Sequence, residues 1–364
     1  MAAILEGIIS ADSHVTEPAG LWQDYIEPAY RDRAPRVESR DDTDVIVCET
    51  ASMVHQVGFL HVGPRIAWGE APNPKGRYAD IPATGWDTTI RIPEIEADGV
   101  HGEFIYPTVA MYFWSIEDVA FGEACFRAYN NWLVDFCRPH PDRFKGCGMI
   151  MIEDMERAVS EVHRVKEMGL SGAMVAVNPV GVKPYHDPMY DPFWAAAEET
   201  GLPVSLHVST DRRRDLGTDP TVKLMHYATV IQQVLCGLIY GGTFDRFPGL
   251  HVVSAENDAG WAGTMIERMD YMESRRGPRP ESAIKQLPSQ YWHNNVSYTF
   301  MRDRTAILAR EVIGVESLMW GSDYPHGDGT YPDSQEILGR LMEGVPDEEQ
   351  RMILRGNAAR VYGF

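Results

Sequence analysis

The chain has 364 residues, 44% of them apolar, and a formal net charge of −20 from 53 acidic and 33 basic residues. This charge argues against a nucleic-acid or anionic-membrane partner, because both bind patches of Lys and Arg. The five cysteines form no Cys-x-x-Cys pair, so neither a disulfide framework nor a thiolate zinc site is indicated. No apolar run approaches the roughly 18 residues needed to span a bilayer, and we expect a cytoplasmic protein.

Short apolar runs alternate with amphipathic segments along most of the chain. The runs predict eight strands, at 7–11, 100–106, 144–150, 172–177, 203–207, 250–255, 295–300 and 315–321. Helical spacing and stop signals predict helices at 90–98, 117–137, 153–168, 192–200, 222–240, 261–275, 302–313, 333–343 and 347–362. Eight strands that alternate with helices indicate parallel βαβ units closed into a (β/α)₈ TIM barrel, with an insertion after the first strand. No Gly-x-Gly-x-x-Gly follows the first strand, which disfavours a dinucleotide-binding sheet.

The insertion spans residues 19–85. It is rich in Pro, Gly and charged clusters, and an accessory strand is expected near 44–49. We interpret this segment as a cap over the site within a single domain that spans residues 1–364.

Metal-competent side chains follow three of the predicted strands. Asp12 and His14 end the first, His207 ends the fifth, and Asp323 follows the eighth. In a barrel these ends share one face, so the four side chains can converge on a divalent ion. Two imidazoles and two carboxylates suit Zn²⁺ best, and the oxygen share also permits Mn²⁺ or Fe²⁺. The competing interpretation is that the histidines are hydrogen-bonded core residues and the aspartates are helix caps.

The chain resembles the amidohydrolase-related (amidohydrolase 2) family over nearly its whole length. That family includes aminocarboxymuconate-semialdehyde decarboxylase, aromatic-acid decarboxylases and several lactone or carbon–carbon hydrolases. The resemblance is carried by Asp12-Ser-His14-Val-Thr-Glu17-Pro, His140-Pro-Asp-Arg-Phe144, Gly201-Leu-Pro-Val-Ser-Leu-His207, Phe244-Asp-Arg-Phe-Pro-Gly249, Glu256-Asn-Asp-Ala-Gly-Trp261, Gly321-Ser-Asp323-Tyr-Pro-His326 and Gly356-Asn-Ala-Ala-Arg360. It implies a metal-bearing barrel, often a dimer, with ligands at Asp12, His14, His207 and Asp323.

The sequence departs from the family pattern at two positions. Asp12 stands where decarboxylases of the family commonly have His or Glu, and Glu256 stands where they place a His after the sixth strand. Glu256 is a candidate base or a partner of the ligands. It cannot bind a substrate carboxylate, which weakens the transfer of a decarboxylase mechanism.

Four further residues are candidates for substrate binding. Glu17 follows His14 by one turn, His326 follows Asp323 by three residues, Arg213 lies in the loop after His207, and Trp114 follows the second strand. Arg213 would clamp a substrate carboxylate. The alternatives are a backbone anchor for Glu17, a hydrogen bond to a ligand for His326, a solvated loop for Arg213, and packing under the insertion for Trp114.

These observations favour a divalent-metal-dependent hydrolase that acts on a small, aromatic or ring-cleavage-derived carbonyl compound. Asp323 would take a proton from the bound water and return it to the leaving group, and Glu256 would assist. The first alternative is a non-oxidative decarboxylase of a small aromatic or unsaturated carboxylic acid, in which Asp323 protonates carbon. The others are a metal-free lactonase and a binding barrel without catalysis. We expect a homodimer or a higher homo-oligomer.

Overall fold

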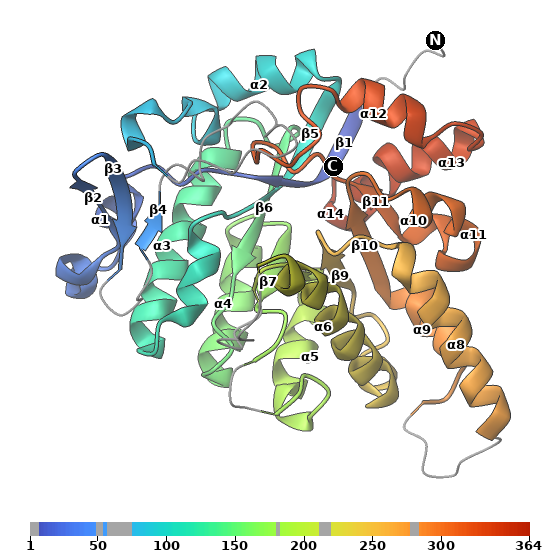
Figure 1. Cartoon of the computed structure of the whole chain (residues 1–364). Helices are drawn as coiled ribbons and strands as arrows, with labels where there is room; N and C mark the ends of the chain where they lie inside the picture. Colours follow the sequence, from blue (N-terminus) through green and yellow to red (C-terminus); the bar gives the residue numbers. More distant parts are fainter. Residues whose placement is uncertain (1–6, 49–53, 57–74, 180–182, 211–219, 277–283) are drawn as a thin grey trace.

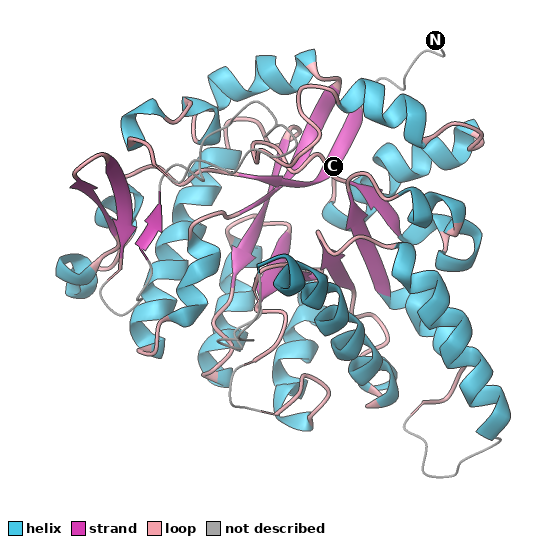
Figure 2. Cartoon of the chain, viewed as in Figure 1, coloured by secondary structure: helices cyan, strands magenta, loops and turns pink. Residues whose placement is uncertain are grey.

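The structure, a computed structural model, describes residues 7–48, 54–56, 75–179, 183–210, 220–276 and 284–364, with the backbone alone for 54–56 and 220–227. Eight parallel strands surround a common axis and helices cover them outside (Figures 1 and 2). The strands are β1 (Ile8–His14), β5 (Val100–Tyr106), β6 (Phe144–Met149), β7 (Gly172–Val175), β8 (Val204–His207), β9 (Val252–Ala255), β10 (Val296–Phe300) and β11 (Leu318–Trp320). This architecture confirms the predicted (β/α)₈ barrel.

The sheet closes between its first and last strands. Its order runs β1-β5-β6-β7-β8-β9-β10-β11, each strand parallel to the next. Just beyond β11, the amide of Asp323 donates to the carbonyl of Asp12 at 2.8 Å, and the amide of His14 donates to that of Tyr324 at 2.6 Å. The strand that carries Asp12 and His14 therefore lies beside the segment that carries Asp323.

Helices connect the strands. The longer ones are α2 (Thr88–Ala97), α3 (Val119–Cys137), α4 (Met155–Glu167), α5 (Asp191–Thr200), α6 (Pro220–Tyr240), α8 (Gly260–Arg276), α9 (Pro288–Asn295) and α12 (Ser334–Leu341). Local signals set several ends. The carboxylate of Asp154 caps α4 through the amide of Arg157, and Gly201 ends α5 at a φ of 63°. No helix in these described ranges combines the length and apolar character needed to cross a membrane.

Three C-terminal elements differ from the prediction. Residues Val315–Ser317 form a 3₁₀ turn, so β11 is shorter than the expected strand. The helix expected at 302–313 is two short ones, α10 (Arg304–Leu308) and α11 (Arg310–Ile313). The last helix, expected at 347–362, contains a π-helical turn between α13 (Asp347–Arg351) and α14 (Asn357–Tyr362). Apolar periodicity does not distinguish these tighter or wider turns from a regular helix.

The segment between β1 and β5 contains a second, small sheet. It is antiparallel, in the order β2 (Arg36–Arg40), β3 (Thr43–Val47) and β4 (Val54–Gln56), and lies at the left in Figure 1. β3 matches the expected accessory strand. Its Asp44 accepts hydrogen bonds from the amide of Tyr78 at 2.8 Å and from the guanidinium of Arg77 at 2.9 Å. These bonds fasten the small sheet to the chain that returns to the barrel.

Candidate metal centre

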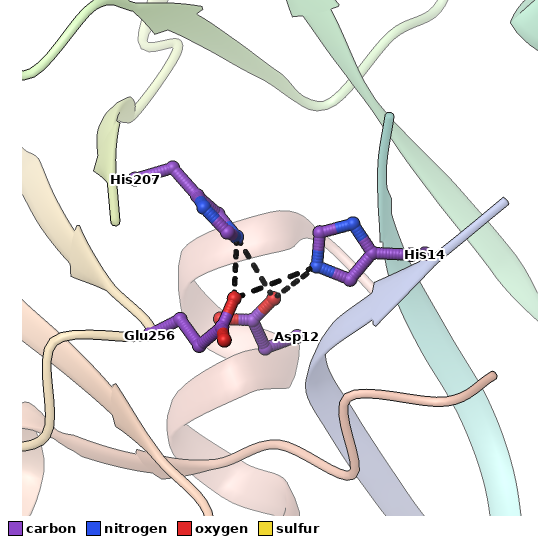
Figure 3. A group of neighbouring side chains, drawn as sticks. All are labelled: Asp12, His14, His207 and Glu256. Carbon is purple, nitrogen blue, oxygen red and sulfur yellow. Dashed lines mark ion pairs between the residues drawn. The ribbon is translucent and has the colours of Figure 1, made fainter. Parts of the chain in front are cut away.

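Four side chains meet at the carboxyl end of the barrel, as Figure 3 shows. Asp12 and His14 come from β1, His207 ends β8, and Glu256 directly follows β9. The Nε2 atom of His207 lies 3.5 Å from Asp12 Oδ1 and 3.3 Å from Glu256 Oε2. The Nε2 atom of His14 lies 3.5 Å from Asp12 Oδ1 and 3.8 Å from Glu256 Oε2.

Three of these separations, at 3.3–3.5 Å, match those of atoms that share a cation, and the fourth, at 3.8 Å, is somewhat longer. They exceed the roughly 2.7–3.2 Å of a direct hydrogen bond. Ligands held at about 2.0–2.2 Å around one metal ion stand about 3–3.5 Å from each other. Among the described residues, four buried atoms here have no hydrogen-bond partner: Asp12 Oδ1, His14 Nε2, His207 Nε2 and Asp323 Oδ2. Because a buried polar atom without a partner is costly, the residues fit a bound divalent ion.

Each imidazole is oriented by its other nitrogen. The Nδ1 atom of His14 lies 2.7 Å from the carbonyl oxygen of Pro107, and that of His207 lies 2.9 Å from the carbonyl of Val208. A carbonyl only accepts, so both Nδ1 atoms carry the proton and both Nε2 atoms present a lone pair to the centre. This is the usual way in which a protein fixes the tautomer of a metal-ligating histidine.

Asp323 lies beside these four and forms a second group with His14 and His326. Its Oδ1 atom is 3.4 Å from His14 Nε2 and 2.8 Å from His326 Nδ1. Asp323 was expected among the ligands, and Glu256 beside them. The structure groups Glu256 with the other three residues, and it groups Asp323 with His14 and His326 and also with Glu256 and Asp328, so the roles of both residues stay predictions.

The partners of His326 determine where a proton resides. The hydroxyl of Thr108 donates its only hydrogen to the carbonyl of Val15 at 2.7 Å, so toward His326 Nε2, at 2.9 Å, it can only accept. His326 Nε2 therefore carries a hydrogen. The 2.8 Å contact between His326 Nδ1 and Asp323 Oδ1 then requires one more proton, shared by the two groups. We call the Asp323–His326 pair, with the proton that it shares, the proton store of the centre.

Two of the carboxylates belong to residues with a strained backbone conformation. Glu256 has a φ of 54° and Asp323 a φ of 56°, in the left-handed region that favours glycine. Neither residue is glycine, so each conformation is held by its surroundings. The amide of Glu256, for example, donates to Thr299 Oγ1 at 2.7 Å. Strain of this kind is concentrated at functional sites, where it directs side chains that regular strands would not.

Burial and mutual repulsion shift the pKa values of these groups. Burial, with the negative charges of Asp328 and Asp12, raises the pKa of Asp323 well above its usual range. Burial also raises the pKa of Glu256, and the charge of Asp323 adds to that rise. Burial alone would lower the pKa of His207, but the carboxylates of Asp12 and Glu256 outweigh it and raise that pKa to about 9 while no ion is bound; a divalent ion at Nε2 would take the place of that proton. Positive charge is therefore favoured at this centre.

Two residues at the centre were not foreseen from the sequence. The hydroxyl of Thr299, near the end of β10, donates to Asp12 Oδ2 at 2.5 Å and holds that carboxylate. Asp258 follows Glu256 by two residues. Both belong to the wall of a cavity of about 50 Å³, lined by Asp12, Glu256, Asp258, Thr299, Phe300 and Met301. The strand-end rule that identified His207 would have found Thr299, had it been applied to hydroxyl groups.

Glu17 is a correction to the expected substrate contacts. Its carboxylate is 1% exposed and accepts hydrogen bonds from the amides of Thr108 at 3.2 Å, Val109 at 2.9 Å and Ala110 at 2.9 Å. Both oxygens are thus engaged by backbone, and the residue anchors the loop after β5. Burial raises the pKa of Glu17 to about 7, against the opposing effect of these amides.

The other expected substrate contacts have different outcomes. Trp114 is 2% exposed, and its ring packs edge-on against Phe126 at 5.1 Å, so it lies in the core. This contact with α3 places Trp114 in the core rather than in a pocket wall, and packing under the insertion stays a prediction. His326 contacts Asp323, as the hydrogen-bond alternative expected. Arg213 lies outside the described residues.

Comparisons with known proteins point to one family. The model of the amidohydrolase family matches residues 82–364. A 2-amino-3-carboxymuconate-6-semialdehyde decarboxylase of Dictyostelium discoideum is 25% identical over 298 residues, which are 79% of each chain. The structure of an amidohydrolase from Mycobacterium avium subsp. paratuberculosis matches 99% of this chain and 100% of its own, with a TM-score of 0.80 and 24% identity. A 5-carboxyvanillate decarboxylase from Novosphingobium aromaticivorans, complexed with manganese and 4-hydroxy-3-methoxy-5-nitrobenzoic acid, matches all of both chains at a TM-score of 0.69 and 19% identity.

Proposed function

Because the chain belongs to the amidohydrolase family, we propose that it is a divalent-metal-dependent carboxy-lyase, which removes carbon dioxide from a small aromatic or unsaturated carboxylic acid. Three buried atoms support the proposed metal dependence: Asp12 Oδ1, His14 Nε2 and His207 Nε2. Among the described residues none of them has a hydrogen-bond partner, and they lie 3.3–3.8 Å from neighbouring candidate ligand atoms. The likeness to two decarboxylases favours this reaction over the hydrolysis that the sequence led us to expect.

Asp12, His14, His207 and Glu256 would hold the ion, with Asp323 as a further ligand within reach. The ion would act as a Lewis acid and bind anionic oxygens of the substrate. Apart from the two imidazoles, the side chains that would hold it are carboxylates. Two imidazoles and several carboxylates suit both zinc and manganese, and the metal content of the purified protein distinguishes them.

The chain's own residues supply the proton that the reaction consumes. As the bond from the substrate carbon to its carboxylate breaks, the electron pair stays on that carbon and carbon dioxide leaves. The carbon then takes a proton, and the Asp323–His326 pair holds one at the edge of the centre, between Oδ1 and Nδ1. Thr108 keeps His326 in the orientation that serves Asp323. The reaction therefore consumes one proton for each carbon dioxide that is released.

The test measures carbon dioxide release from hydroxybenzoates and from carboxymuconate semialdehydes, with the protein loaded with Mn²⁺ or Zn²⁺ or stripped by a chelator. We expect release with a loaded protein only, and product that carries deuterium at the vacated carbon in D₂O. Asp323→Asn should lower the rate by about 10²–10⁴-fold, the range for loss of a general acid. The matched control is Asp142→Asn, the same chemical change at an exposed position.

A second candidate is the hydrolase. It is favoured by Glu256, whose partly exposed carboxylate lines the cavity beside Asp12 and could take a proton from water. Hydrolysis of a lactone or amide without carbon dioxide would decide for it, and hydrolysis by the stripped protein would decide for a metal-free lactonase.

A further inference from the structure

Arg91 is a fully buried cation outside the metal centre. It lies on α2, is 0% exposed, and pairs with the equally buried Glu103 of β5. The pair is bidentate, with Nε 2.6 Å from Oε2 and Nη2 3.0 Å from Oε1. A buried ion pair of this kind often contributes little net stability. We therefore looked for a further role of Arg91 in the segments that surround it.

The other hydrogens of Arg91 reach the segments that carry the candidate ligands. Its Nη1 atom donates to the carbonyl of His14 at 2.9 Å and to that of Thr84 at 3.4 Å. Its Nη2 atom donates to the carbonyl of Tyr324 at 3.3 Å, and its guanidinium lies 4.7 Å from the ring centre of Tyr324. Tyr324 directly follows Asp323. The side chain of Arg91 is therefore hydrogen-bonded to both segments that meet where the barrel closes between β1 and β11.

This closure differs from the other strand pairs. Elsewhere the neighbouring strands form parallel ladders, with register shifts in the β1–β5 pair, whereas β1 and β11 appear in no such pairing among the described residues. Two backbone hydrogen bonds and a cluster of hydroxyls replace the ladder. The hydroxyl oxygens of Ser10 and Ser13 each lie 3.1 Å from Ser322 Oγ. The distance between His14 and Asp323 therefore depends on side chains as well as on sheet geometry.

We propose that Arg91 is a positioning residue, which sets the separation of His14 and Asp323 and thereby the affinity of the centre for its metal. The inference rests on the proposed metal dependence. The hydrogen bonds of Arg91 to these segments go to the backbone carbonyls of His14 and Tyr324, and it would act on the centre through them. A merely structural Arg91 would stabilise the apo and the metal-loaded protein equally. A positioning Arg91 stabilises the geometry that the metal needs, so its loss should appear in the difference between the two states.

The experiment compares Arg91→Lys with Arg164→Lys. Arg164 makes a similar bidentate pair with Glu161 on α4, at 2.7 Å and 2.5 Å. Its other hydrogen bonds go to Asn131 Oδ1 and Met168 Sδ, which do not belong to the centre. Mn²⁺ affinity is measured by calorimetric titration, and thermal unfolding is followed with and without Mn²⁺. We expect Arg91→Lys to weaken Mn²⁺ binding at least tenfold and to shrink the metal-induced rise in melting temperature. Arg164→Lys should lower both melting temperatures alike and leave affinity unchanged.

Glu103→Gln is the milder second variant, since it leaves Arg91 in place with a weaker partner. We expect about a threefold loss of Mn²⁺ affinity, and this variant decides the matter if Arg91→Lys does not fold. Unchanged affinity in the folded variants overturns the inference while leaving the proposed function intact. If the wild-type protein binds neither Mn²⁺ nor Zn²⁺, the proposed function fails first and the inference fails with it.

Discussion

The two asparagines at the amino end of the barrel and the candidate centre at its carboxyl end differ in how their buried polar atoms are paired. At the amino end, the side-chain amide of Asn357 donates to the carbonyls of Val315 and Leu318, both at 2.8 Å. Asn295 does the same for Pro248 at 3.0 Å and Leu250 at 2.8 Å. At the carboxyl end, buried nitrogen and oxygen atoms of the candidate centre remain without partners.

The difference separates residues that stabilise from residues that act. Each buried polar atom left unpaired costs about 1–3 kcal/mol, so the two asparagines avoid a cost that the candidate centre accepts. A bound cation removes that cost, which links the stability of the carboxyl end to metal. The same division of labour holds for TIM barrels generally, with catalysis at the carboxyl ends of the strands.

The largest expected effect comes from the carboxyl end. His207→Ala removes a ligand from the middle of the centre, and we expect loss of stoichiometric metal and a fall in activity of about 10³-fold or more. The imidazole of His207 also packs against Tyr106, and its Nδ1 donates to the carbonyl of Val208, so the apo protein should lose some stability. The metal-induced gain in stability should disappear, because the Nε2 atom that faces the centre is gone. The measurements are elemental analysis, turnover, and urea unfolding with and without metal.

A metal-induced gain in stability as large as that of the wild-type protein would contradict this view of the carboxyl end. It would mean that His207 is a satisfied core histidine, the alternative that the sequence left open. Retention of one metal per chain would show that the remaining side chains suffice to bind it.

The next effect concerns the amino end and should reverse the pattern. Asn357→Ala leaves two buried carbonyls without a donor, so we expect about 2–3 kcal/mol less stability. Metal affinity and the turnover of the folded protein should be unchanged. Urea unfolding and calorimetric metal titration measure the two quantities. A weakened metal affinity in this variant would show that the two ends are coupled through β11.

The sequence sufficed for the fold and for much of the centre, for the same physical reason. Strand and helix periodicities are local, and eight strands in alternation with helices allow few topologies. Once the barrel is accepted, the ends of its strands lie together, so Asp12, His14, His207 and Asp323 were brought to one face. Their roles as ligands stay predictions until a metal is measured.

The sequence was least informative where a side chain's role depends on tertiary partners. The local sequence does not distinguish Glu17 from Asp12. The carboxylate of Glu17 accepts hydrogen bonds from three backbone amides, whereas Asp12 Oδ1 has no hydrogen-bond partner among the described residues. Likewise Glu256 joins the ligand group through a strained φ that no periodicity encodes. Thr108 and Arg91 matter through bonds to residues more than 70 positions away.

A third prediction tests the amino end by pH. His251 precedes β9, its Nε2 lies 3.0 Å from Ser297 Oγ, and burial, with the charge of Arg360, lowers its pKa to about 4. The unfolded chain, with an ordinary histidine pKa of about 6.5, binds more protons than the folded one between pH 6.5 and 4, so stability is lost as pH falls through this window.

The size of that loss is at most about 3 kcal/mol, and we expect roughly 2 because the ring is only partly buried. His251→Asn should remove this part of the pH dependence without changing metal affinity at pH 7. Urea unfolding at pH 7, 5.5 and 4 measures it. An unchanged slope in the variant would assign the acid sensitivity to other groups.

The smallest effect should come from the proton store at the carboxyl end. Thr108→Val keeps the shape of the side chain but removes the oxygen that accepts from His326 Nε2. His326 then loses its orientation toward Asp323, and we expect kcat to fall about tenfold, equivalent to the roughly 1–1.5 kcal/mol of one hydrogen bond. Metal content should stay at the wild-type value, because Thr108 contacts none of the four grouped ligands. Thr200→Val, which deletes a hydroxyl bonded only within α5, is the matched control. A variant that loses metal but keeps its turnover per bound metal would place Thr108 with the structural residues, and Asp323 would then receive its proton without help from His326.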